Sequence, residues 1–258
     1  MTTRRGGWAR FALLCLITAV ILVPVLHTVL GALAPGGRIG LGTLSGLAGL
    51  VAGPALPWFA NSLAVSLASV AVCVLIGAPA GYVLARGRAR AVGGYALLVF
   101  VLQAFPVVTA VVPLFLLFAR VQLVDSLPGV AVVYIGTSLA AATWMLSVSI
   151  ATMPVQLEEA AWLDGCSVAG AFFRVILPGA LPGILSTGIF TFLLSWNDYL
   201  VALVFLRSQQ NYTLAIGLES AGHSPQLALL MMLPPVVLFA VFHRSFRTDG
   251  VSGAFAGR

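Results

Sequence analysis

The chain has 258 residues, of which 60% are hydrophobic and 8% are charged, and its formal net charge is +6. Ordinary soluble domains carry roughly a quarter charged residues, so this composition excludes a soluble enzyme, a disordered tail and a DNA-binding domain. All 13 basic residues are arginine. Because a nucleotide-binding P-loop needs a lysine to reach the phosphates, the chain is not expected to bind ATP by that route.

Six apolar stretches approach or exceed the length of about 20 residues that a helix needs to cross a bilayer. They predict an all-α integral membrane protein in which residues 1–258 form a single transmembrane domain. The predicted spans are residues 11–34, 58–85, 92–119, 127–152, 183–206 and 226–242.

The first stretch has a second interpretation. Arg4, Arg5 and Arg10 precede an apolar run that ends near the small residues Ala32 and Ala34, as in a secretory signal peptide. The run is about 24 residues long, whereas the apolar part of such a signal has about 7–15. A first membrane helix is therefore favoured over a cleaved signal.

The arginines predict the orientation of the spans. With the N-terminus inside, ten arginines fall in cytoplasmic segments, and only Arg38, Arg120 and Arg207 fall outside. Because cytoplasmic loops carry an excess of basic residues, both termini are expected in the cytoplasm.

Glycine and proline occur inside several predicted spans. Proline frees a backbone carbonyl, which a membrane helix tolerates only where a neighbour or water satisfies it. The residues indicate either kinked helices packed in a bundle or kinks that shape a pathway. Gly77 and Gly81, four residues apart, permit close contact between helices. The prolines in question are Pro79, Pro106, Pro113, Pro234 and Pro235.

The long cytoplasmic segment 153–182 predicts a helix, a turn and a second helix. Pro154 suits a helix start, and Gly165 suits a left-handed helix end. Ser167 then caps a second helix that Pro178 and Pro182 end. One apolar stripe is expected on this second helix, made of Val168, Ala171, Phe172 and Val175.

Such a hairpin needs a surface to bury against. Lipid headgroups, the chain's own helix bundle and a groove in a partner protein are the three alternatives. Helices that lie on lipid favour basic residues, and this one begins with Glu158 and Glu159. The lipid alternative is therefore disfavoured.

Residues 159–178 carry a specific spacing: Glu159-Ala160-Ala161, then Gly165, then a run from Val175 to Pro178. This spacing resembles the EAA loop of ABC-importer permeases, and more closely that of the carbohydrate-uptake branch, the maltose-type second permease subunit. Stretches along nearly the whole chain resemble the same family: residues 61–66, 81–86, 113–115, 123–126, 196–199, 233–234 and 250–257.

The resemblance implies a transport subunit, not an enzyme, in the cytoplasmic (inner) membrane of a bacterium. The implied partners are a second permease subunit in a heterodimer, two ATPase subunits, an extracytoplasmic solute-binding protein and a sugar, with no nucleic acid. ATP and Mg²⁺ would be bound by the ATPase, so this chain needs no cofactor. It also implies an ATPase-coupling set in the loop: Glu158, Glu159, Ala160, Ala161, Asp164, Gly165, Leu177 and Pro178.

Asp198 is the only acid inside a predicted span, which makes it a candidate for the substrate pathway. Asn197, Asn61 and Gln103 are further polar candidates, with hydrogen bonds between helices as the alternative role. A proton-coupled secondary transporter that uses Asp198 is a second hypothesis, although no inverted repeat is evident. No span contains Arg or Lys, which favours a neutral sugar, and the sequence contains no recognisable metal-ligand spacing or catalytic constellation.

Overall fold

The computed structural model describes residues 4–33, 48–50, 52–104, 106–222 and 224–249. Within these ranges the regular elements are all helical. Four of these helices are long and apolar enough to cross a membrane, and there are six spans if each of two bent helix pairs counts as one. The all-α membrane fold predicted from the composition is thereby confirmed. The four are α1 (Arg4–Leu33), α3 (Ala55–Arg86), α6 (Leu127–Ala151) and α13 (Pro225–Asp249).

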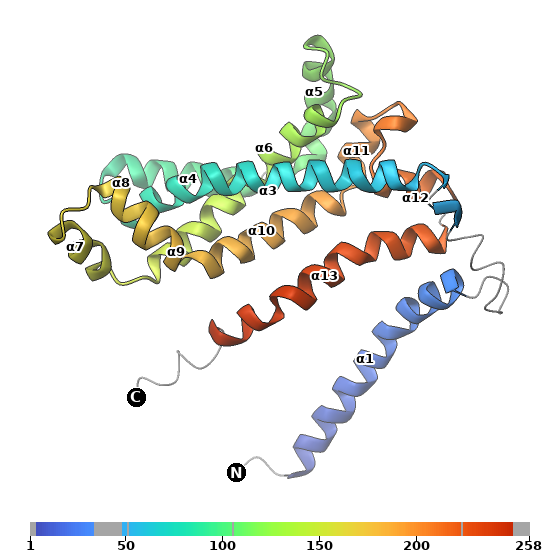
Figure 1. Cartoon of the computed structure of the whole chain (residues 1–258), viewed down its shortest axis with the longest axis horizontal. Coiled ribbons are helices and arrows are strands. Elements are labelled where there is room, and N and C mark those ends of the chain that lie inside the picture. The colour runs from blue at the N-terminus through green and yellow to red at the C-terminus, as the bar shows by residue number, and fades with distance from the viewer. Residues whose placement is uncertain (1–3, 34–47, 51, 105, 223, 250–258) are drawn as a thin grey trace.

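The centre of the fold is a bundle of α3, α6 and α10 (Leu181–Trp196), which lie along one another in Figure 1. Buried small polar side chains occur along these helices, including Ser66 and Ser69 of α3 and Thr187 and Thr191 of α10. Small residues let helix backbones approach closely in a membrane, where no hydrophobic force drives helices together. The core of this bundle thus combines close backbone packing with large buried side chains such as Trp196, Leu146 and Ile150.

Gly77 and Gly81 lie on α3 where it meets α6. A Cβ atom placed at Gly81 would lie 2.9 Å from the backbone nitrogen of Ser147 and 3.0 Å from the carbonyl oxygen of Thr143. At Gly77 it would lie 3.5 Å from the backbone nitrogen of Thr143. The close helix contact predicted from the glycine spacing is therefore confirmed, with α6 as the partner of α3.

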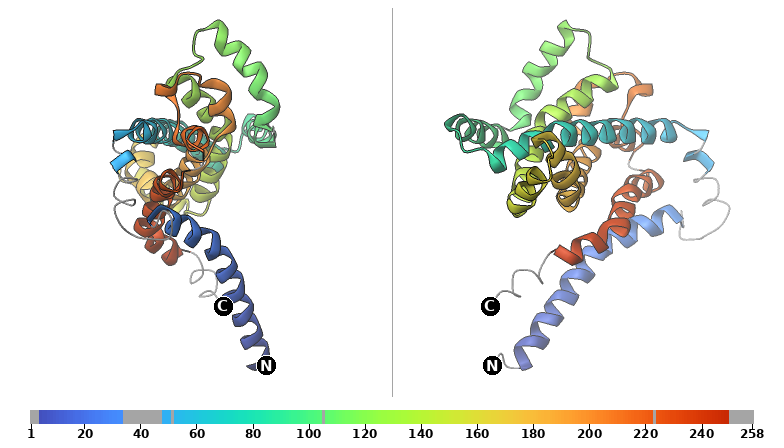
Figure 2. Two further views of the ribbon diagram at one scale, coloured as in Figure 1. Left: turned by 90° about the vertical axis from the view of Figure 1, so that its right-hand side faces the viewer. Right: turned by 60° about the vertical axis from the view of Figure 1, so that its left-hand side comes forward.

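The helix α1 packs against α13, and the two diverge from the central bundle (Figures 1 and 2). Its described apolar side chains, such as Leu14, Val20 and Leu26, are mostly exposed. A helix that is apolar on all sides and uncovered by its own chain is suited to contact with lipid or with another membrane subunit. In Figure 1 the Arg4 end of α1 and the Asp249 end of α13 point toward the same side as α7.

The third predicted span, 92–119, is not one straight helix. It forms α4 (Arg90–Ala104) and α5 (Val107–Arg120), which are bent by 93° relative to each other. Pro106 has extended backbone angles (φ −69°, ψ 120°) and begins the second helix as its cap. The interruption predicted from Pro106 is confirmed, whereas Pro113 lies inside α5 without breaking it.

The fifth predicted span, 183–206, is also divided. It forms α10, which ends at Trp196, and α11 (Leu200–Phe205). The carboxylate of Asp198 accepts hydrogen bonds from the backbone N–H groups of Val201 (2.9 Å) and Ala202 (3.3 Å). Because these are the free donors at the start of a helix, Asp198 starts a new helix instead of continuing the old one.

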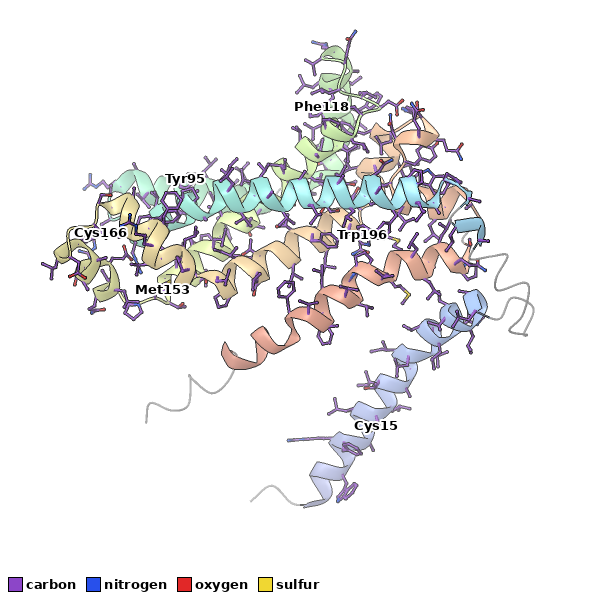
Figure 3. The ribbon with its side chains drawn as sticks, in the orientation of Figure 1. Cys15, Tyr95, Phe118, Met153, Cys166 and Trp196 are labelled. Atoms are coloured by element: carbon purple, nitrogen blue, oxygen red, sulfur yellow. The ribbon has the colours of Figure 1, made fainter. Side chains whose placement is uncertain are left out.

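The last long helix, α13, contains Pro234 and Pro235 without ending there. Pro235 has no N–H to donate to the carbonyl of Met231, four residues earlier. The indole Nε1 of Trp196 donates to that carbonyl instead, at 2.9 Å. Trp196 is fully buried, stacks on Phe192 and projects from α10 toward α13 (Figure 3).

This compensation predicts a non-additive pair of substitutions. Trp196→Phe removes the donor and leaves the Met231 carbonyl unpaired, which should cost about 1–2 kcal/mol of stability. In a Pro235→Ala background the new N–H can satisfy that carbonyl, so Trp196→Phe should cost clearly less. Thermal unfolding of the four proteins in detergent measures the difference. Equal costs in both backgrounds would contradict the compensation.

Candidate functional site

Residues 153–182 form the predicted helical hairpin. Its first arm is α7 (Gln156–Leu163), and its second arm runs through α8 (Val168–Ala171), the π-helix η2 (Phe172–Ile176) and α9 (Leu177–Gly179). The second arm meets α10 at an angle of 71°. The hairpin thus stands at the end of the central bundle, beside the last turn of α3 (Figure 1).

The turn between the arms is fixed by backbone hydrogen bonds. The N–H of Gly165 donates to the carbonyl of Trp162 (3.0 Å), and the N–H of Cys166 donates to that of Ala161 (2.9 Å). This pair of bonds with a left-handed residue is a Schellman motif, and Gly165 has a φ of +87°. Ser167 then accepts a bond from the N–H of Gly170 at 3.1 Å. The predicted helix end and the predicted cap are both confirmed.

The second arm buries a different stripe from the one predicted. Ala171 and Phe172 are buried as expected, but Val168 is exposed and Ile176 takes the inward position expected for Val175. The cause is the π-helical turn, which contains more residues per turn than an α-helix and therefore rotates the following residues. Ile176 and Phe172 pack with Leu146 and Ile150 of α6 and Ala78 of α3. One side of the hairpin thus buries against the chain's own bundle.

The outer side of the hairpin is uncovered. Leu163 is 89% exposed and Phe173 is 64% exposed. Large apolar side chains that gather on a surface mark a site of interaction. The hairpin tip is defined here by its exposed residues: Leu157, Glu159, Ala160, Trp162, Leu163, Asp164, Val168 and Phe173.

The predicted coupling residues divide between the two sides. Glu159, Ala160 and Asp164 lie in the hairpin tip, and Gly165 and Pro178 are also exposed. Ala161 is buried, and Leu177 is half-buried against the bundle.

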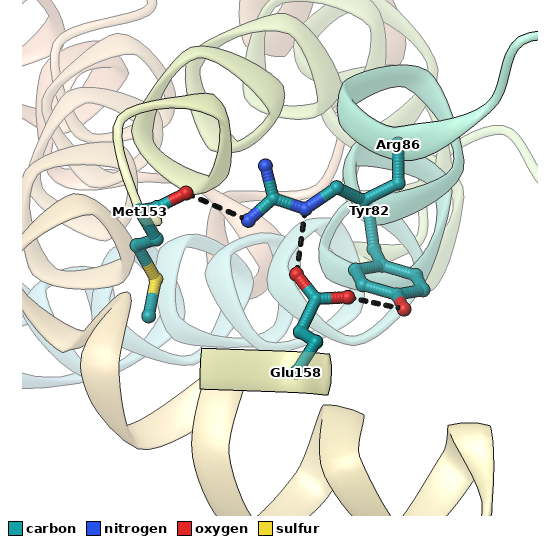
Figure 4. Close-up of polar contacts among 4 residues, drawn as sticks. All are labelled: Tyr82, Arg86, Met153 and Glu158. Atoms are coloured by element: carbon teal, nitrogen blue, oxygen red, sulfur yellow. Dashed lines mark hydrogen bonds and ion pairs between the residues drawn. The ribbon is translucent and has the colours of Figure 1, made fainter. Parts of the chain in front are cut away.

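Glu158 has a different position, inside the chain (Figure 4). Its side chain is 1% exposed and forms an ion pair with Arg86, whose Nε lies 2.6 Å from Oε1. The hydroxyl of Tyr82 donates to Oε2 at 2.8 Å. A second guanidinium nitrogen of Arg86 donates to the carbonyl of Met153 at 2.9 Å. We call Tyr82, Arg86, Met153 and Glu158 the Arg86 cluster.

A cavity of about 580 Å³ lies between α4, α5, α6 and α10. Asp198 and Gln103 line it, together with Tyr134 of α6. The Tyr134 hydroxyl donates to Oδ1 of Asp198 at 3.0 Å, the same oxygen that starts α11. Oδ2 of Asp198 accepts no hydrogen bond from the part of the chain that the structure describes. Other polar lining residues are Thr137, Ser138 and Ser195.

Two of the four predicted pathway residues lie outside the cavity and form hydrogen bonds to backbone carbonyls. Asn61 donates through Nδ2 to the carbonyls of Gln210 (2.9 Å) and Tyr212 (3.0 Å), in the connection between α11 and α12 (Leu214–Ser220). Asn197 donates to the carbonyl of Leu193 in its own helix, at 2.9 Å. The cavity therefore brings together Asp198 and Gln103 but neither asparagine.

The loops at the end of the bundle opposite the hairpin are joined by Asp125. Its carboxylate accepts the backbone N–H groups of Arg207 and Ser208 and the Ser208 hydroxyl, and the Asn211 amide donates to it as well. Burial alone would raise the pKa of Asp125, but these hydrogen bonds outweigh it and lower the pKa to about 2. The carboxylate therefore stays ionised, and its contacts persist until the pH falls toward that value.

The sequence did not indicate the partners of the buried Glu158 or of the half-buried Asp198. Tyr82 and Arg86 are four residues apart at the end of α3, which places them on one helix face. This spacing indicates that the two side chains can contact a common partner. Tyr134 carried no such indication, because it lies 64 residues from Asp198. No group of three or more His, Cys, Asp or Glu side chains that could hold a metal occurs within the described ranges.

Residues 74–248 match the family model described as "Binding-protein-dependent transport system inner membrane component". The match covers more than half of the 258 residues. It includes α6, the hairpin, α10 and α13 up to Thr248.

Curated relatives agree with this match. A putative ABC transporter permease protein, ORF1, of Streptomyces antibioticus is 41% identical over 75% of this chain and 88% of its own length. The sulfoquinovosyl glycerol transport permease SmoH of Agrobacterium fabrum is 34% identical, over 76% of this chain and 70% of its own. The trehalose transport permease SugB of Mycobacterium tuberculosis is 32% identical, over 76% of each.

One solved structure has the same fold. It is the crystal structure of a bacterial ABC transporter involved in the import of the acidic polysaccharide alginate, and it matches with a TM-score of 0.79 over 95% of this chain and 99% of that chain. The sequence identity is 17%, so the likeness concerns the fold.

Proposed function

Since the chain belongs to the family of binding-protein-dependent transport system inner membrane components, we propose that it is the permease subunit of an ATP-driven importer for a carbohydrate. The relatives named for sulfoquinovosyl glycerol and trehalose support a carbohydrate as the solute. The subunit itself is not an enzyme, because ATP hydrolysis resides in a separate chain that binds ATP and Mg²⁺.

The observation that carries this proposal is the hairpin tip. Its exposed leucines, Trp162 and Phe173 are the apolar anchors of a docking surface. Beside them, the acidic Glu159 and the small Ala160 suit insertion into a partner groove that contains basic groups. The ATPase subunit is the partner that docks there. The full assembly contains a second permease, two ATPase subunits and an extracytoplasmic solute-binding protein.

The orientation follows from this docking. An ATPase works in the cytosol, so the hairpin lies on the cytoplasmic side, together with Arg86, Arg88 and Arg90. This agrees with the excess of arginine in the predicted inner segments. Both termini of the multi-pass chain are then cytoplasmic, and Asp125 with the loop that it holds faces outward.

The cavity around Asp198 is the proposed substrate route. Oδ2 of Asp198, which no described residue donates to, is an acceptor, and the amide of Gln103, whose Nε2 also donates to the carbonyl of Ala140 at 3.4 Å, is a mixed donor–acceptor; such groups bind sugar hydroxyls. The described residues that line the cavity carry no positive charge, which favours a neutral sugar over an acidic one.

Reconstitution of the complex tests the function. The chain, co-purified with its associated subunits and placed in liposomes with the solute-binding protein, should take up labelled trehalose or another neutral oligosaccharide only when ATP is present. A protonophore should leave uptake unchanged, which separates this function from proton coupling through Asp198. Uptake that persists without ATP and collapses with the protonophore would reverse the conclusion.

A substitution in the hairpin tip links uptake to the docking surface. Glu159→Lys reverses the charge offered to the ATPase and should lower uptake by about tenfold or more. Thr152→Lys places a lysine on an exposed position at the same end of the molecule but outside the tip, and should transport normally. Equal uptake by the two variants would show that the hairpin tip is not part of the surface that couples to the ATPase.

A further inference from the structure

The last turn of α3 touches both arms of the hairpin. Tyr82 and Arg86 lie four residues apart on one face of α3. The Tyr82 ring lies 5.2 Å from the ring of Phe172 in the second arm, measured between centroids. Its hydroxyl donates to Glu158 in the first arm at 2.8 Å. A single side chain of α3 is therefore held by both arms.

Arg86 extends this connection to a third element. One nitrogen pairs with Glu158 of α7, and another donates to the carbonyl of Met153, which follows the end of α6. A planar guanidinium can serve two acceptors in fixed directions. The end of α3, the end of α6 and the first arm of the hairpin are thus tied at one point (Figure 4).

Because the ion pair between Arg86 and Glu158 is buried, the loss of either partner is costly. Glu158 is 1% exposed and Arg86 is 15% exposed. Removing one member of a buried ion pair leaves an uncompensated charge away from water, which is far more costly than the loss of an exposed pair. The hairpin is accordingly held on α3 most firmly while both charges are present.

The neighbouring glutamate faces the other way. Glu159 lies in the hairpin tip and is exposed, because successive residues of a helix are rotated by about 100°. The two adjacent acids are therefore offered to different surfaces: Glu158 to the interior of this chain, and Glu159 to a partner.

We propose that Glu158 is a positioning residue that transmits displacement of the hairpin to α3 through Arg86 and Tyr82, whereas Glu159 meets the ATPase. This inference rests on the proposed function. From α3 the displacement passes to α6 across the close contact at Gly81 and Ser147, and α6 carries Tyr134, the hydrogen-bond partner of Asp198 in the cavity. The Arg86 cluster is thus the first link between the hairpin and the substrate route.

Two matched variants separate the roles of the two glutamates in the reconstituted complex. Glu158→Gln and Glu159→Gln make the same chemical change at adjacent positions. Glu158→Gln should keep co-purification of the ATPase and basal ATP hydrolysis within about twofold of wild type. It should lower sugar uptake, and the stimulation of hydrolysis by loaded binding protein, by about tenfold. Glu159→Gln should weaken co-purification of the ATPase.

Arg86→Gln and the double variant test whether the pair acts as a unit. Arg86→Gln should reproduce the uncoupling of Glu158→Gln, and the double variant should be no worse than either single one, because the interaction is already lost. Wild-type uptake in Glu158→Gln, or a deficit explained fully by lost ATPase, would overturn the proposal. Additive losses in the double variant would also overturn it.

Hydrogen exchange of the full chain alone tests the anchoring without any transport assay. Amides of α7 should exchange about tenfold faster in Glu158→Gln than in wild type. In Glu159→Gln their exchange rate should equal that of wild type. Unchanged exchange in Glu158→Gln would overturn the anchoring itself. If anchoring is seen but the wild-type complex shows no ATP-dependent uptake, the proposed function has failed, and the transmission proposal falls with it.

Discussion

Replacing Gly81 with valine is expected to remove most of the folded protein from the membrane. A Cβ at this position would lie 2.9 Å from the backbone nitrogen of Ser147, 3.0 Å from the carbonyl oxygen of Thr143 and 3.2 Å from the carbonyl carbon of Leu146. These are backbone atoms of a packed helix, which cannot turn aside as a flexible side chain can. Overpacking of a dense core costs about 1–3 kcal/mol, and here valine adds two further methyl groups at the closest contact.

Fluorescence-detected size-exclusion chromatography of the tagged protein in mild detergent gives the measurement. Gly93→Val is the matched control, because Gly93 lies in α4, is exposed and has no atom within 4 Å of its added Cβ. The control carries the same loss of glycine and the same β-branched side chain in a helix. A Gly81→Val protein with the yield and melting temperature of Gly93→Val would show that α3 and α6 are not in close contact.

Replacing Gly165 with valine is expected to abolish uptake while leaving the protein in the membrane at its normal level. Gly165 has a φ of +87°, and an added Cβ meets open space there. The penalty is therefore one of backbone conformation, about 1–2 kcal/mol for an ordinary residue and more for a β-branched one. Because the turn is exposed and outside the bundle, this strain distorts the hairpin tip and not the membrane core.

Uptake by the reconstituted complex and the amount of protein in the membrane are measured together. Gly165→Asn is the control, because asparagine adopts left-handed backbone angles more readily than other residues. Its uptake should be well above that of the valine variant. If both variants transport alike, the left-handed turn has no part in coupling.

The features that sequence reasoning predicted well are encoded locally. The span 127–152 matches α6, Leu127–Ala151, to within one residue, because Ser126 caps its start and Pro128 suits the first turn. The hairpin turn followed from Gly165 and Ser167 for the same reason. A capping side chain or a left-handed glycine acts within a few residues, so its effect can be predicted without knowledge of the rest of the fold.

The features that could not be predicted from the sequence depend on distant residues or on small changes of helical pitch. The ion pair between Arg86 and Glu158 joins positions 72 residues apart, and no local pattern connects them. The π-helical turn at Phe172–Ile176 moved Ile176 into the site expected for Val175, because one extra residue in a turn changes every later direction. The division of the fifth span required knowing that the carboxylate of Asp198 would start a new helix.

The uncovered hairpin tip has a consequence for the cell that makes this chain. Before assembly, Leu163, Trp162 and Phe173 remain in water, and such apolar surface promotes aggregation as well as recognition by chaperones and proteases. Binding of a partner stabilises only the bound form. If the proposed ATPase covers this surface, copies made in excess of that partner keep it exposed, and balanced synthesis of the two chains is expected to determine how many intact complexes accumulate.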